Sequence, residues 1–153
     1  MNRDISIRLI SENKADFMPL LLLGDEDEKY INAYLKCGDL FALYDGDLKC
    51  VCVVTDEGGG VLEIQNIATD KCYQRQGYAS RMIGHLTERY AKRYNKIIVG
   101  TGDVPGVLAF YGKCGFIITH RIPDYFTTHY DFPIIEDGVL LKDKVYLERN
   151  LVL

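Results

Sequence analysis

The hydrophobic and polar positions of this chain follow two periods, and each period predicts one kind of element. Residues 5–10 alternate as a half-buried strand does, and Ser11 is a suitable cap for a helix over residues 11–23. A second helix is predicted over residues 25–37, because its acidic opening suits the positive end of the helix dipole. The same acidic residues, 25–28, are also candidates for attracting an amine.

The run over residues 61–69 has an irregular pattern. Its hydrophobic residues Leu62 and Ile64 share one parity, whereas Ile67 has the other, so strict strand alternation breaks near Gln65-Asn66. One extra residue there, a β-bulge, would return these side chains to one face. A bulge would also bend the strand and expose backbone groups, and bulges are common beside binding sites.

The remaining elements complete an α/β pattern. The dipeptide Asp45-Gly46 separates two β-rich runs and predicts a hairpin before the irregular strand. After that strand come a helix over 77–93, an apolar strand over 96–102, a helix over 104–114, a strand over 115–122, an aromatic segment over 123–138 and a last strand over 144–151. The apolar strand is expected to be buried on both faces and parallel to the irregular one, because a helix connects them.

These elements predict one α/β domain of the α+β kind over residues 1–153. Its sheet would be mixed but mostly antiparallel, with helices at its sides and an opening between a splayed central pair of strands. With 48% hydrophobic and 26% charged residues, no signal peptide and no stretch able to span a bilayer, a soluble, cytoplasmic protein is expected.

Charge and cysteine content narrow the class of ligand. The net charge of -4 gives no basis for binding nucleic acid, whereas an acidic surface suits a cationic small molecule. The five cysteines lack the spacing of metal ligands, so we expect reduced thiols and no metal site.

The segment QRQGYA, residues 74–79, places a glycine where the helix over 77–93 begins. The first N–H groups of a helix lack intrahelical partners, and Gly77 leaves room for a ligand to approach them, so this junction can bind phosphate. Arg75 and Arg81 could add positive charge. The segment matches neither a Walker loop nor the GxGxxG fingerprint, and a plain turn into a helix is the alternative interpretation.

A second motif, FYGKCGF at residues 110–116, follows the apolar strand and carries a tyrosine on a short helix. With Gln74, Gly77 and Ala79 in the first motif, the chain resembles the GNAT superfamily of N-acetyltransferases. The two motifs span residues 61–121 in the order and with the β-α-β-α spacing of that family. The resemblance implies a GNAT-like domain and acetyl-CoA as co-substrate.

By this resemblance, acetyl-CoA would lie along the irregular strand and the start of the helix that follows it. Main-chain groups of the strand would hold the pantetheine arm, and N–H groups of residues 76–80 would hold the pyrophosphate. The expected cofactor-binding residues are Ile67, Ala68, Thr69, Gln74, Arg75, Gln76, Gly77, Tyr78, Ala79 and Ser80.

Acetyl transfer to an amine needs a proton donor for the departing thiolate and a neutral nucleophile. Tyr111 is the expected donor, because a phenol is protonated at neutral pH; the alternative is a packed aromatic residue. Glu63 has side-chain parity opposite to its apolar neighbours and is the candidate base, directly or through water. An ion pair with a neighbour, or an amine that arrives neutral, would leave Glu63 without this role.

The acceptor is expected to be a small primary amine, with a protein N-terminus or lysine side chain as the alternative. A non-catalytic sensor that binds acyl-CoA is the rival from another class, and the hydroxyl of Tyr111 favours the enzyme over it. The aromatic segment over 123–138 could close over the acceptor, pack on its own domain, or meet a second subunit in a homodimer.

Overall fold

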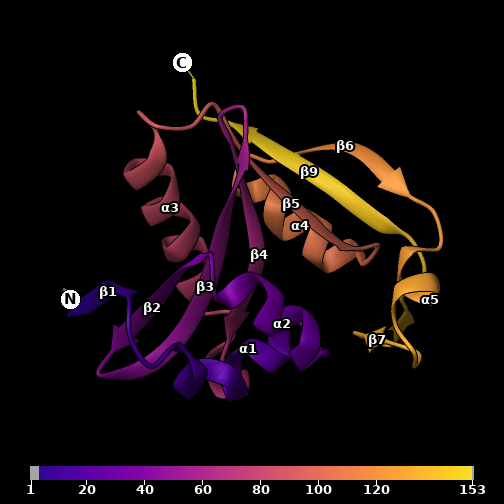
Figure 1. The fold of residues 1–153 in the computed structure, drawn as a ribbon, viewed down its shortest axis with the longest axis horizontal. Coiled ribbons are helices and arrows are strands. Elements are labelled where there is room, and N and C mark those ends of the chain that lie inside the picture. The colour runs from indigo at the N-terminus through magenta and orange to yellow at the C-terminus, as the bar shows by residue number, and fades with distance from the viewer. Residues whose placement is uncertain (1–3, 153) are drawn as a thin grey trace.

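The computed structural model describes residues 4–152. Its central feature is a mixed β-sheet (Figure 1). In this part of the chain the sheet has 7 strands in the order β1-β2-β3-β4-β5-β9-β6. The strands are β1 (Ile5–Ile10), β2 (Asp39–Asp45), β3 (Asp47–Gly58), β4 (Val61–Thr69), β5 (Lys96–Gly102), β6 (Ile117–Ile122) and β9 (Lys144–Asn150). Only β4 and β5 pair in parallel among these described strands, so the predicted mixed and mostly antiparallel sheet is confirmed.

Helices cover both faces of the sheet. Alternate side chains of β2 and β3 enter two cores, with Phe41 and Cys52 on one face and Leu40 and Val51 on the other. The first core packs against α3 (Tyr78–Tyr90) and α4 (Pro105–Lys113), and the second against α1 (Met18–Gly24) and α2 (Glu28–Leu35). No helix in the part of the chain that the structure describes is long and apolar enough to cross a membrane.

The first predicted helix is wrong in its extent. A 3-10 turn, Lys14–Phe17, precedes α1, and Pro19 occupies the first turn of α1. Proline lacks an N–H and clashes with the preceding turn inside a helix, so a continuous helix over residues 11–23 cannot form. The second predicted helix is also shorter, because Asp27 caps α2 by accepting a hydrogen bond from the N–H of Lys29 at 2.9 Å.

The predicted bulge is present in β4. Val53 of β3 pairs with Asn66 and Val54 pairs with Ile64, so Gln65 is the extra residue. Ile64 and Ile67 consequently reach the same core despite their opposite parity. A bulge bends a strand, and this one lies where the pairing of β4 with β5 ends, directly after Ile64.

The predicted opening between the central strands is also present. β4 and β5 pair from Val61↔Lys96 to Ile64↔Val99, and the register does not continue into the last residues of either strand. The expectation that β5 is buried on both faces is wrong, because Ile97 and Val99 are buried whereas Ile98 and Gly100 are only half-buried. The less buried face of β5 lies beside the cleft described next, beyond the part of the sheet that α1 and α2 cover.

The segment before β9 forms a small substructure that packs against the rest of the domain. It contains α5 (Tyr125–His129) and a short hairpin of β7 (Ile135–Glu136) and β8 (Val139–Leu140). Figure 1 shows α5 and β7 beyond the start of β9. Ile134 and Leu141 at the base of this hairpin pack with Val104, which anchors it to the loop before α4.

Candidate active site

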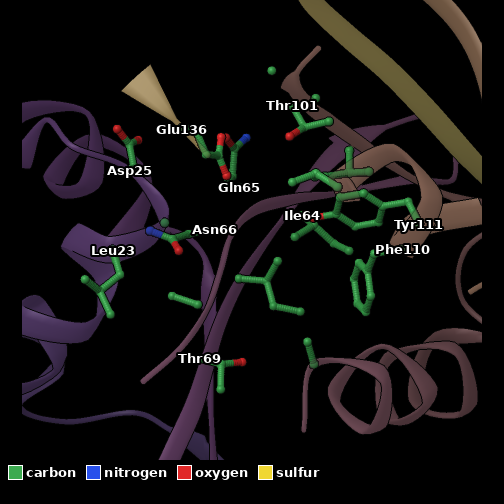
Figure 2. A pocket seen from close by; sticks show the side chains of 18 of the residues that line it. Leu23, Asp25, Ile64, Gln65, Asn66, Thr69, Thr101, Phe110, Tyr111 and Glu136 are labelled. Atoms are coloured by element: carbon green, nitrogen blue, oxygen red, sulfur yellow. The ribbon is translucent and has the colours of Figure 1, made fainter. Parts of the chain in front are cut away.

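A cleft of about 1300 Å³ opens where β4 and β5 separate. One end is formed by the start of α3 and by α4, and the other by the α1–α2 connection, α5 and β7. Figure 2 shows Tyr111 and Phe110 on one side of the cleft and Asp25 and Glu136 on the other. The cleft therefore joins a helix N-terminus to an acidic and aromatic compartment.

The start of α3 is suited to binding an anion. Gly77 has a φ of 87°, and the first intrahelical hydrogen bond runs from the N–H of Arg81 to the carbonyl of Gly77 at 3.0 Å. The N–H groups of residues 78–80 therefore precede the helical ladder and are the ones that a helix leaves for a ligand. No heavy atom would lie within 4 Å of a Cβ at Gly77, so a phosphate can approach closely.

Most of the residues expected to bind the cofactor line this cleft. They are Ile67, Ala68, Thr69, Gln74, Arg75, Gly77, Tyr78, Ala79 and Ser80. Gln76 is not among the lining residues. The Tyr78 side chain is buried and donates a hydrogen bond to Asp45 at 2.6 Å, so Tyr78 offers its backbone alone.

Tyr111 occupies the middle of the cleft. It is 5% exposed and packs edge-on against Phe110 and Phe116, with ring centroids 5.2 and 5.5 Å away. Burial raises the pKa of Tyr111, so the phenol stays protonated at neutral pH. Its hydroxyl has no hydrogen-bond partner within residues 4–152, although its ring is firmly held.

Glu63 lies beside the cleft but does not line it. Its side chain is 8% exposed, on a strand that pairs it with Thr55 and Ile98. Burial raises the pKa of Glu63, while the charge of Lys144 opposes this rise. The structure thus places Glu63 next to residues that line the cleft, among them Thr55 and Lys144, but outside the lining itself.

The end of the cleft opposite α3, which is the candidate acceptor end, contains a carboxylate held by hydrogen bonds. Asp25 accepts hydrogen bonds from the hydroxyls of Tyr34 at 3.3 Å and Tyr130 at 3.1 Å, and from the N–H of Asp27 at 3.2 Å. Burial raises the pKa of Asp25, and these donors limit the rise. Asp25 therefore belongs to the cleft wall, whereas Asp27 performs the helix-capping role expected of the acidic run.

The aromatic segment packs on its own domain and also lines the cleft. The hydroxyl of Tyr30 donates to the carbonyl of His129 at 2.7 Å, and the rings of Tyr30 and Tyr130 lie 5.2 Å apart. These contacts connect α2 to the segment after α5 across the acceptor end. Tyr125, Phe126 and Tyr130 thereby become part of the lining.

Glu136 is a site residue that sequence reasoning missed. It lies on β7, lines the cleft and projects into it in Figure 2. Burial raises the pKa of Glu136, and the neighbouring charges of Asp137 and Glu26 add to the rise. The available sequence signal was the Asp137-Gly138 turn, whose residues both have positive φ and which fixes a hairpin directly after the glutamate.

Two further observations describe the chemistry of the chain. All five cysteines are free thiols, and burial raises the pKa of Cys50 to about 11. No group of histidine, cysteine, aspartate and glutamate side chains within residues 4–152 is arranged to hold a metal ion.

The sequence matches the family described as "Acetyltransferase (GNAT) domain" over residues 30–118. It is 32% identical over 150 residues to the "uncharacterized N-acetyltransferase YvbK" of Bacillus subtilis strain 168, covering 96% of this chain and 97% of that protein.

Solved structures show the same similarity. A GNAT family acetyltransferase from Elizabethkingia anophelis with acetyl-CoA bound has a TM-score of 0.91 and 28% identity, over 97% of this chain and 99% of that chain. A Bacillus subtilis acetyltransferase in complex with CoA has a TM-score of 0.90 and 32% identity, over 97% of this chain and 100% of that chain. These matches extend well beyond the two motifs.

Proposed function

This chain belongs to the GNAT family of N-acetyltransferases, and on that premise we propose that it acetylates a small, positively charged primary amine with acetyl-CoA. The main support for a cationic acceptor is the set of residues at the end of the cleft opposite α3. There the carboxylates of Asp25, Glu26 and Glu136 stand among tyrosine rings. Carboxylates attract an ammonium group, and aromatic faces stabilise a cation held against them.

The cofactor would lie at the other end of the cleft. The N–H groups of residues 78–80 and the open space above Gly77 suit the pyrophosphate of CoA. The pantetheine arm would run along Ile67, Ala68 and Thr69, because β4 has parted from β5 there and offers backbone groups to a ligand. The acetyl group would then lie near Tyr111.

Tyr111 is proposed as the general acid that protonates the departing thiolate of CoA. Its buried phenol stays protonated until a strong base forms beside it. A thiolate in apolar surroundings is such a base: burial raises the pKa of the Cys50 thiol to about 11 in the same core, even though a hydrogen bond with Thr69 lowers it. The same apolar environment therefore raises both the pKa of the Tyr111 phenol and the pKa of the CoA thiol.

The shape of the acceptor end favours a small molecule over a protein. Contacts of Tyr30 with Tyr130 and His129 join the two walls there, as does the hydrogen bond between Tyr130 and Asp25. A folded protein chain would have to displace these contacts to place its N-terminus beside Tyr111. A protein N-terminus or lysine, and a sensor that binds acyl-CoA without turnover, remain the alternatives.

The experiment is an acetylation screen with a fixed panel. The purified protein is incubated with acetyl-CoA and butylamine, benzylamine, 1,4-diaminobutane, or peptides with a free N-terminus or a lysine. Thiol release and product mass are both recorded. We expect turnover with alkylamines and little with peptides. Faster acetylation of peptides would contradict the small acceptor, and CoA binding without any acetylation would support the sensor.

A cytoplasmic location and a homodimer stay predictions. The edge strand β6 is a candidate surface for pairing, since Ile117 is 66% and Ile118 is 53% exposed.

A further inference from the structure

We infer that Glu136 is the general base that removes a proton from the acceptor ammonium, an inference that rests on the proposed function. It replaces the candidate suggested by strand parity, Glu63, with a residue from a different element. Glu136 is contributed by β7, a strand of two residues near the end of the aromatic segment over 123–138. Nothing in its local sequence resembles a catalytic motif.

The position of Glu136 carries the inference. It lines the cleft, and Figure 2 shows its carboxylate projecting into the space that Gln65 and Tyr111 also border. Burial raises the pKa of Tyr111, and the negative charge of Glu136 adds a smaller contribution, as expected for two groups that line one cleft. A base on one side and an acid on the other is the arrangement that acyl transfer between amine and thioester needs.

The other carboxylates near the acceptor end are less suited to this role. Both oxygens of Asp25 already accept hydrogen bonds, from Tyr34, Tyr130 and the N–H of Asp27. Glu63 is buried, does not line the cleft, and has its pKa lowered by the charge of Lys144 against the rise that burial causes. By contrast, Glu136 accepts no side-chain hydrogen bond within the described residues and is exposed to solvent along the cleft, although the walls around its carboxylate still desolvate it in part.

The charges around Glu136 make it a stronger base than an ordinary glutamate. Burial raises the pKa of Glu136, and the nearby carboxylates of Asp137 on its hairpin and Glu26 on the α1–α2 connection add to the rise. Asp25 faces the same end of the cleft, and the cationic Lys144 of β9 also lines the cleft. A carboxylate with a raised pKa accepts a proton from an ammonium group with a smaller free-energy penalty.

The proposed step conserves protons and electrons. Glu136 takes one proton from the ammonium group, and the lone pair freed on nitrogen attacks the acetyl carbonyl carbon. When the adduct collapses, the C–S bond breaks, its electron pair leaves with sulfur, and Tyr111 protonates that sulfur. The nitrogen gives its second proton to the Tyr111 phenolate, and the Glu136 carboxyl releases the first proton to solvent.

The test is the pH dependence of kcat/KM with butylamine, benzylamine and 1,4-diaminobutane, for wild type and Glu136→Gln. Near pH 7 the substitution should lower kcat/KM by about 10²- to 10⁴-fold, the span of a positioned general base. The deficit should shrink by about tenfold per pH unit as the pH rises toward the pKa of the amine, because solution then supplies the neutral amine. The affinity for CoA, measured by calorimetry, should not change.

Three further variants separate the alternatives. Glu136→Asp should retain the shape of the wild-type profile at a lower rate, and Glu88→Gln, exposed on α3, should retain both rate and profile. A deficit in Glu136→Gln that is equal at every pH, or a pH-dependent deficit in Glu63→Gln alone, would overturn the inference. Wild-type protein that acetylates none of the amines would overturn the proposed function, and this inference with it.

Discussion

Replacing Gly77 by aspartate tests the cofactor end of the cleft. Gly77 has a φ of 87° and no heavy atom would lie within 4 Å of an added Cβ, so the new side chain meets backbone strain but no neighbour. Asparagine and aspartate both tolerate this left-handed conformation, at a cost of up to about 1–2 kcal/mol. Gly77→Asn is therefore a matched control that differs from Gly77→Asp in charge alone.

The magnitude follows from the position of that charge. For the Coulomb estimate we take a separation of about 6 Å between a carboxylate at residue 77 and a phosphate at the helix N-terminus. At an effective dielectric constant of about 20 the repulsion is about 3 kcal/mol, and partial solvent screening halves it. We therefore expect CoA to bind about 10- to 100-fold more weakly to Gly77→Asp than to Gly77→Asn.

Calorimetry with CoA measures this difference, and circular dichroism melts check that both variants are folded. The penalty should decrease as salt is added, because the charges are partly exposed. S-acetylpantetheine, which lacks the pyrophosphate, should be used equally well by both variants. Equal CoA affinities in two folded variants would refute the assignment of the pyrophosphate to the start of α3.

Two other predictions concern the acceptor end and the packing of β4. The KM for a cationic amine should rise several-fold between about 0.1 M and about 1 M salt, as the Debye length falls from about 10 Å to about 3 Å; a constant KM would argue against capture by Asp25, Glu26 and Glu136. Gly24→Ala should lower the free energy of unfolding by about 1–3 kcal/mol, because its Cβ would clash with the Oδ1 of Asn66. Gly84→Ala should instead raise the free energy of unfolding by about 0.5–1 kcal/mol, because no heavy atom lies within 4 Å of the added Cβ. Similar urea midpoints for Gly24→Ala and Gly84→Ala would contradict the packing described.

The cofactor half of the site could be predicted from the sequence because its determinants are local. The parity change between Ile64 and Ile67 predicts a bulge near Gln65-Asn66, and the structure has it at Gln65. The glycine at residue 77 directly before a helical pattern likewise predicts the turn at the start of α3, where Gly77 has a left-handed conformation. Both features depend on residues adjacent in the chain, where periodicity and backbone conformation carry the information.

The acceptor half could not be predicted in this way. Asp25 enters the cleft because Tyr34 and Tyr130, which lie far apart in the sequence, both donate to it. Glu136 reaches the cleft because Ile134 and Leu141 anchor its hairpin against Val104. Side-chain parity indicates that Glu63 points away from the core that contains Leu62 and Ile64. Parity cannot indicate whether Glu63 lines the cleft, because residues from other strands and loops form the lining. Contacts between distant segments decide these positions.

Tyr111 is where the account as a whole can be tested most directly. Tyr111→Phe removes one hydroxyl and keeps the ring that packs against Phe110 and Phe116. Single-turnover rates of acetyl transfer should be measured, because slow product release could conceal a change in chemistry under steady-state conditions. We predict a loss of about 10²- to 10⁴-fold with CoA affinity unchanged. Wild-type single-turnover rates in Tyr111→Phe would contradict acid catalysis by this residue.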